Sequence, residues 1–125
     1  MSGNKISNIF DESINTISKS KNLEESIQQV IDKIIHCFEN GNKIIVFGNG
    51  GSAADSQHFA AEFIGRFLKE RNSLPAISLT TDSSILTALG NDYSFETIFS
   101  RQCESIVQKD DIVFGISTSG NSLNV

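Results

Sequence analysis

Two amphipathic helices are predicted at the start of the chain, because apolar residues recur at helical spacing over residues 5–20 and again over residues 23–40. Asn22 is expected to cap the second helix, and Gly41 to close it in a left-handed conformation. The apolar residues of the second helix are expected to be buried: Leu23, Ile27, Val30, Ile31, Ile34 and Phe38. The two helices would then form one more layer of the domain or a surface between subunits.

The periodicity changes after the second helix. Residues 43–47 are a continuous β-branched and aromatic run, which predicts a strand covered on both faces. Short strands follow at 76–79 and 112–116, and helices are predicted over 53–68, 82–90 and 95–106. Strands that alternate with helices favour a parallel sheet with helices on both faces. We therefore predict one α/β domain over residues 1–125, a doubly wound parallel sheet in 43–125 preceded by helices in 5–40.

The chain stops at Val125, soon after the last predicted strand. A doubly wound sheet needs a helix after that strand to cover one of its faces. The sequence is therefore expected to be a fragment, truncated at its C-terminus.

Composition and charge exclude several classes of protein. The 125 residues include 10 Lys and Arg against 15 Asp and Glu, a net charge of −5, which argues against binding to nucleic acid. Apolar runs are far shorter than the roughly 20 residues that span a bilayer. The N-terminus has no apolar core of a secretory signal, and Cys37 and Cys103 lack metal or disulfide spacing. A cytoplasmic protein without a membrane or nucleic-acid partner is expected.

Two loops of small polar residues follow predicted strands. The first loop, residues 48–52, has three Gly, one Asn and one Ser; the second loop, residues 117–122, has three Ser and one Thr. Backbone amides, hydroxyls and a following helix N-terminus suit an anion such as phosphate, and open parallel sheets bind ligands at this edge. Tight turns without a ligand remain the alternative, because Gly and Ser are common turn residues.

A dinucleotide site fits the first loop less well. Gly48, Gly50 and Ala53 satisfy the GxGxx[G/A] pattern, but Asp82 follows Gly48 by 34 residues, more than the roughly 20 typical of the acidic ribose partner. The Walker pattern fails because no Lys follows the glycines.

The helix after the first loop carries the candidate chemistry. Asp55, His58 and Glu62 share one face, and His58 and Glu62 could offer nitrogen and oxygen ligands to one divalent metal such as zinc. A surface His–Glu pair is the alternative, but a helix that starts at a phosphate loop is expected to turn this face towards a ligand. Arg66 is expected one turn further along the same face, either near the pocket or paired with Glu62.

Three segments together indicate a family: GNGGSAADSQHFAAEFIGRF, ALGNDYSFETIFSRQ and ISTSGNS. From about residue 9 to residue 125, the chain resembles the SIS-domain family and, within it, the bacterial phosphoheptose isomerases. The resemblance implies a flavodoxin-like fold and a ketose–aldose isomerase that converts sedoheptulose 7-phosphate to D-glycero-D-manno-heptose 7-phosphate for the lipopolysaccharide core. It also implies a homotetramer with active sites near the subunit interfaces.

The resemblance assigns roles residue by residue. It makes Glu62 the catalytic base, and His58 and Glu62 two ligands of a Zn²⁺ ion whose remaining Gln and His ligands lie beyond the stretch present here. The residues placed around the sugar phosphate are Asn49, Gly50, Gly51, Ser52, Asp55, Arg66, Asn91, Asp92, Ser117, Thr118, Ser119 and Ser122. The alternative is a non-catalytic SIS scaffold that binds the replication initiator protein. The homologue of this scaffold type has a non-acidic residue where Glu62 stands.

Overall fold

The computed structural model describes residues 3–125, and the chain divides into two units, Met1–Lys33 and Ile34–Val125. The first unit contains α1 (Gly3–Lys19), the 3-10 turn η1 (Ser20–Leu23) and the first part of α2 (Glu24–Glu39). Ser13, Thr16 and Ser20 each donate a hydrogen bond to the carbonyl four residues earlier, so these hydroxyls are satisfied within the helix.

Asn22 does not cap the second helix, contrary to the sequence prediction. It lies inside η1, and the residues that flank this turn, Lys19 and Glu24, both have right-handed helical backbone angles. An N-cap residue needs an extended backbone, so a continuous helical path leaves no position for one. The predicted burial of Leu23, Ile27, Val30 and Ile31 is also wrong for this chain, since all four are exposed.

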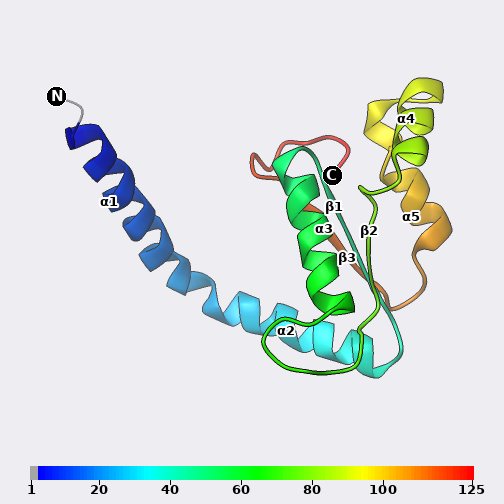
Figure 1. Ribbon diagram of the computed structural model, residues 1–125, viewed down its shortest axis with the longest axis horizontal. Coiled ribbons are helices and arrows are strands. Elements are labelled where there is room, and N and C mark those ends of the chain that lie inside the picture. The colour runs from blue at the N-terminus through cyan, green and yellow to red at the C-terminus, as the bar shows by residue number, and fades with distance from the viewer. Residues whose placement is uncertain (1–2) are drawn as a thin grey trace. The chain divides into compact units, whose positions relative to one another are not determined.

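The second unit is built on a parallel sheet of β1 (Ile44–Gly48), β2 (Ala76–Ser78) and β3 (Ile112–Ile116), in the order β2-β1-β3 (Figure 1). The helices of this unit are α3 (Gly51–Ile64), α4 (Ser83–Asp92) and α5 (Ser100–Ile106), with a 3-10 turn η2 (Phe95–Thr97) before α5. The predicted α/β class and parallel sheet are therefore confirmed.

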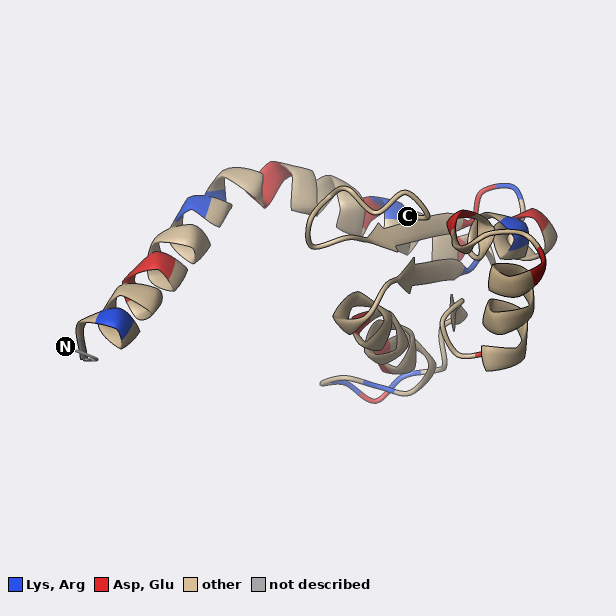
Figure 2. Cartoon of the chain, turned by 90° about the horizontal axis from the view of Figure 1, so that it is seen from above, with Lys and Arg blue, Asp and Glu red and all other residues tan. Residues whose placement is uncertain are grey.

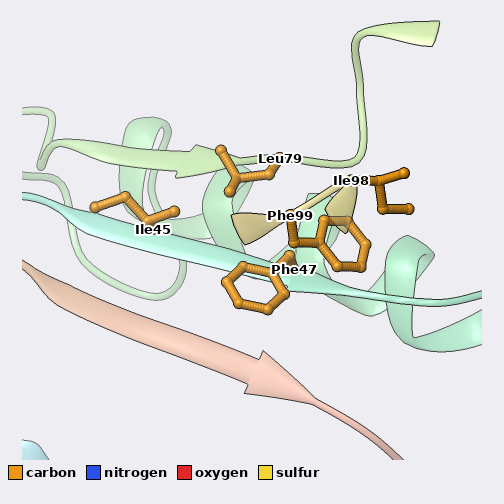
Figure 3. Packing of buried hydrophobic residues seen from close by; sticks show 5 residues of the cluster. All are labelled: Ile45, Phe47, Leu79, Ile98 and Phe99. Atoms are coloured by element: carbon orange, nitrogen blue, oxygen red, sulfur yellow. The ribbon is translucent and has the colours of Figure 1, made fainter. Parts of the chain in front are cut away.

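Side chains of β1 alternate between two apolar cores. Ile45 and Phe47 pack against Leu79, Ile98 and Phe99, and the rings of Phe47 and Phe99 are stacked with centroids 4.7 Å apart (Figure 3). Ile44 and Val46 face the other way, towards a core completed by the following residues: Ile34, Phe38, Phe59, Ala60, Phe63, Ala76, Ile112, Phe114 and Ile116. Every residue of β1 is buried, as predicted for a strand covered on both faces.

Of two predicted helix ends, one is confirmed and the other is wrong. Asp82 caps α4 as predicted, its carboxylate accepting from the Ile85 amide at 2.9 Å. The helix predicted to run to Leu68 ends at Ile64 instead. Arg71 reaches back to this end and donates to the carbonyls of Glu62 and Phe63 at 2.6 and 2.8 Å. These bonds satisfy carbonyls that a continuing helix would otherwise use.

None of the helices described over residues 3–125 combines the length and the apolar character needed to cross a membrane.

A buried ion pair lies at the edge of the sheet where β1 and β3 begin. The Asp111 side chain is 1% exposed, and its carboxylate lies 2.6 Å from the Lys43 ammonium. Burial alone would raise the pKa of Asp111. Hydrogen bonds from the Lys43 side chain, the Gln108 and Lys43 amides and the Asn42 side chain outweigh burial and lower the pKa from 3.8 to about 2. The interaction therefore favours the ionised, folded form.

Replacing Asp111 with Asn is expected to lower the free energy of unfolding at pH 7 by about 2 kcal/mol, because Lys43 loses its buried partner. Since folding lowers this pKa, the stabilisation is present above 3.8 and is lost as the pH falls through about 2. Urea unfolding of both proteins between pH 7 and pH 2 should show that the difference in their free energies of unfolding decreases between pH 3.8 and about 2.

The matched control is Asp110→Asn, a change at an exposed neighbour with φ of 69°, which Asn tolerates well. Its stability should stay within about 0.5 kcal/mol of the parent at every pH. A stability difference for Asp111→Asn that does not vary with pH would contradict the assignment.

Candidate functional site

The first and second loops meet at the carboxyl edge of the sheet. They follow β1 and β3, which are neighbouring parallel strands whose ends, Gly48 and Ile116, lie opposite each other. The Ser52 and Thr118 hydroxyl oxygens lie 3.4 Å apart across the two loops. The prediction that both loops lie at one edge is therefore confirmed, and this edge is where open parallel sheets bind ligands.

Gly48 allows this close approach. A Cβ at this position would lie 2.6 Å from the Ile116 carbonyl oxygen and 2.8 Å from the Ser52 Cβ. Both distances are shorter than van der Waals contact, and the first contact is to backbone that has little freedom to move. The end of β1, the start of α3 and the end of β3 thus come together only with Gly at position 48.

The second loop is organised by its own side chains. Ser117 donates to the Ser122 hydroxyl at 3.1 Å, and the Ser119 hydroxyl accepts from the Asn121 amide at 3.2 Å. A hydroxyl has one donor and two acceptor positions, so these bonds leave capacity for a ligand. Thr118 is exposed between them.

No charged side chain belongs to either loop or to the strand before it. Residues 44–54 and 112–125 contain no Lys, Arg, Asp or Glu, and the strands and the segment that ends at the C label are tan in Figure 2, without blue or red. An anion at this edge would therefore be held by neutral N–H and O–H donors and by the partial positive charge at the α3 N-terminus.

A pocket of about 490 Å³ opens beside the first loop. It is bounded by the end of β1, the first loop, α4 and η2, and its lining is largely apolar. Its lining residues are Gly48, Asn49, Gly50, Ala53, Thr80, Leu86, Thr87, Gly90, Phe95, Ile98 and Phe99.

Asn91 and Asp92 lie at the C-terminal end of α4, beside this pocket rather than in its lining. The lining extends along α4 as far as Gly90. Both following side chains are exposed, and the Asn91 amide donates to the Asp92 carboxylate at 2.8 Å. Their predicted role in binding a sugar stays a prediction.

His58 and Glu62 form a pair in which His58 is exposed and Glu62 is half-buried. Their Nε2 and Oε1 atoms lie 3.3 Å apart, and the side chains are 78% and 34% exposed. The prediction that this face points inward is therefore wrong for the chain by itself. The reason is the packing of α3, which buries Ser52, Ser56 and Ala60 and leaves the opposite stripe, including the exposed Asp55, facing outward.

Arg66 does not continue the face of Asp55, His58 and Glu62. It lies beyond the end of α3, and its Nε atom is 3.4 Å from the Glu70 carboxylate, with both side chains exposed. Of the two alternatives for Arg66, the pairing with Glu62 is not formed, because the helix stops before Arg66 could reach the same face; a role near the pocket stays a prediction.

His58 and Glu62 have the right donor atoms for zinc but supply two ligands only. Within residues 3–125, no group of three or more His, Cys, Asp or Glu side chains is placed to hold a metal ion. A tetrahedral protein site needs more ligands than this pair provides. Binding of a zinc ion stays a prediction: the donor atoms of His58 and Glu62 suit zinc, but two ligands do not complete its coordination.

Two residues at the site escaped the sequence analysis. Arg71 caps the α3 end that carries Glu62, and the only sequence signal is a basic residue beyond a helix. Asn124 exchanges two side-chain hydrogen bonds with Asn49 of the first loop. Nothing in a local pattern links residues 75 positions apart.

Known proteins resemble this chain over nearly its whole length. A family profile described as SIS domain matches residues 9–125. The chain is 56% identical over 124 residues to a phosphoheptose isomerase of Aquifex aeolicus and 54% identical over 116 residues to one of Helicobacter hepaticus. These matches cover 97% and 93% of this chain but 64% and 59% of the relatives, so the chain spans less than two thirds of their length.

Solved structures give the same result. The chain matches the phosphoheptose isomerase GmhA of Neisseria gonorrhoeae with a TM-score of 0.90 and 43% identity. It matches a phosphoheptose isomerase of Francisella tularensis with a TM-score of 0.93 and 40% identity. Each match covers 99% of this chain and 65% of the other.

Replacing Gly48 with Ala is expected to lower the free energy of unfolding by about 2 kcal/mol or more, because the new methyl group would overlap the Ile116 carbonyl. Chemical denaturation checks this. Gly90→Ala is the matched control: it lies in α4 with nothing within 4 Å of the added Cβ, and should be neutral or stabilising. Equal stability of the two variants would refute the close-approach argument.

Proposed function

The chain belongs to the SIS-domain family, and we propose that it carries the sugar-phosphate site of a phosphoheptose isomerase. The observation that supports this most is the meeting of two loops of neutral donors at the carboxyl edge of the sheet, with the Ser52 and Thr118 hydroxyls 3.4 Å apart. The names of its relatives indicate the same substrate class. We propose sedoheptulose 7-phosphate as the substrate and D-glycero-D-manno-heptose 7-phosphate, for the lipopolysaccharide core, as the product.

The phosphate would bind the second loop, where four hydroxyls follow β3. We assign it to Ser117, Thr118, Ser119 and Ser122, together with the amides at the start of α3. The sugar chain would extend along the first loop, from Asn49 to Ser52, towards the C-terminal end of α4. Asp55, Arg66, Asn91 and Asp92 would lie around it in the assembled protein.

Glu62 would transfer the proton between the two reacting carbons. Its carboxylate takes a proton from C1 of the ketose, the electron pair forms the C1–C2 double bond of an enediol, and the same proton returns to C2. A hydroxyl proton moves from the C1 oxygen to the C2 oxygen in the same conversion, so no oxidant is needed. The His58 Nε2 atom lies 3.3 Å from the Glu62 Oε1 atom, so the imidazole would stay beside this carboxylate.

A proton transfer at carbon needs a site from which water is largely excluded. Glu62 is 34% exposed and His58 78% exposed, so this face must be covered when the reaction occurs. We propose that the cover comes from a second subunit of a homotetramer, with active sites near the interfaces. When bound, Zn²⁺ would supply positive charge at the substrate oxygens, and His58 and Glu62 would be two of its ligands.

Replacing Thr118 with Val is expected to weaken the binding of sedoheptulose 7-phosphate about tenfold, because a hydroxyl that donates to a charged phosphate is removed at constant side-chain volume. Isothermal titration calorimetry on the 125-residue chain checks this. Ser105→Ala, an exposed hydroxyl on α5, is the control and should bind like the parent. Unchanged affinity of Thr118→Val would contradict the assignment of the second loop to phosphate.

Replacing Glu62 with Gln is expected to leave sugar-phosphate binding within about twofold of the parent and to slow proton exchange at C1 by at least about 100-fold. The measurement, made on the complete protein, is deuterium incorporation at C1 in D₂O, followed by proton NMR; it requires the base but not a completed turnover. The carboxamide has the size of the carboxylate but cannot accept the proton. The variant should therefore keep its affinity for the sugar phosphate and lose proton exchange.

Glu104→Gln, an exposed carboxylate on α5, controls for a general change in charge and should exchange at the parental rate. Proton exchange by Glu62→Gln at the same rate as in the parent would contradict the assignment of Glu62 as the catalytic base. A complete, assembled parent protein that binds the sugar phosphate without any exchange would favour the non-catalytic scaffold.

A further inference from the structure

The first loop is joined to the end of the chain by a reciprocal pair of amides. The Asn49 Nδ2 atom donates to the Asn124 Oδ1 atom at 2.7 Å, and the Asn124 Nδ2 atom donates to the Asn49 Oδ1 atom at 3.0 Å. Both side chains are half-buried. The pair links a residue directly after β1 to one just beyond the second loop.

Two opposed hydrogen bonds fix the direction of both amides. Turning either amide over would place nitrogen against nitrogen and oxygen against oxygen, and both bonds would be lost. An amide has two N–H donors and an oxygen with two lone pairs, and the pair uses one donor and one acceptor of each. Asn49, which lines the pocket, therefore keeps one N–H and one lone pair for a ligand.

The first loop needs such a restraint because of its glycines. Gly50 has φ of 56° and is followed by Gly51, and neither has a side chain that could hold the backbone in one conformation. The Ser52–Thr118 contact between the loops is longer, at 3.4 Å. The amide pair is thus the shorter of these two side-chain links that the first loop makes with the C-terminal segment.

Asn124 is itself held in place. The Val125 amide donates to the Ser122 carbonyl at 3.1 Å, which closes a turn around Asn124. The Val125 side chain lies against Gly115 of β3, where a Cβ would approach it to 2.9 Å. The residue that orients Asn49 is therefore anchored to the sheet by its neighbours.

We infer that Asn124 is a positioning residue of this site, one that orients Asn49 towards the sugar part of a sugar phosphate without contacting the ligand. The inference rests on the proposed function. It assigns the phosphate to the hydroxyls of the second loop and the direction of the sugar hydroxyls to the Asn49 amide, with Asn124 acting through Asn49.

A double-mutant cycle in the 125-residue chain tests this. Asn49→Ala and Asn124→Ala should each weaken the binding of sedoheptulose 7-phosphate about tenfold, and the double variant should bind no more weakly than Asn49→Ala alone. Inorganic phosphate should bind all of these proteins within about threefold of the parent. A merely structural role of Asn124 would instead weaken both ligands alike.

NMR supplies a second readout. In a ¹⁵N-labelled chain, the side-chain NH₂ protons of Asn49 should exchange slowly with water in the parent and rapidly in Asn124→Leu, which keeps the volume but not the bonds. Asn72→Ala, at an exposed Asn remote from both loops in the sequence, is the matched control and should change neither affinity nor exchange.

The outcomes separate the two proposals. If the parent binds no sugar phosphate, both the proposed function and the inference that rests on it are overturned. If the parent binds and Asn124→Ala binds equally well, or its effect persists in the Asn49→Ala background, the inference alone is overturned. Equal weakening of sugar phosphate and inorganic phosphate also overturns it.

Discussion

The site depends on a steric constraint at the end of the central strand. Gly48 lies opposite Ile116 in the sheet, and the start of α3 presses against the same point. The absence of a Cβ brings three backbone segments closer than any other residue would allow. Two loops that are far apart in the sequence then share one edge, and their amides and hydroxyls can act on one ligand. The proposed binding edge is therefore formed by the packing of the strand, and no charged side chain belongs to its two loops.

The order of strands and helices was predictable because each has a strong periodic signal. The continuous apolar run of β1, the cap at Asp82 and the alternation of elements all favour one α/β arrangement, and the structure has it. Helix ends set by distant or competing contacts were not predictable. The apolar residues Phe67 and Leu68 continue the helical pattern beyond Ile64, yet Arg71 binds the carbonyls at that point. Likewise, Asn22 has the right chemistry for a cap, but η1 keeps the backbone helical.

The candidate site has two halves, the two loops and the His58–Glu62 pair. The sequence predicted the position of the loops but not the direction in which the pair points. Parallel strands end at the same edge, so two loops after neighbouring strands were expected to meet. The spacing of His58 and Glu62 indicated a shared helix face but not the direction of that face. That direction follows from the small residues Ser52, Ser56 and Ala60, which recur every four positions and let α3 pack closely on the sheet. The link between Asn49 and Asn124 is a purely tertiary contact and had no sequence signal.

These two halves also differ in what they need to work. The loops form a set of neutral donors held together within the described chain, at the edge where we propose that the phosphate binds. His58 and Glu62 lie on the outward side of α3, where water would compete with any substrate and screen the carboxylate. The proposed phosphate site and the proposed base thus lie on differently exposed parts of the chain. A protein surface that covered this side of α3 would strengthen the interactions of Glu62 by excluding water, while leaving the loops unchanged. Assembly would then control proton transfer more strongly than it controls binding.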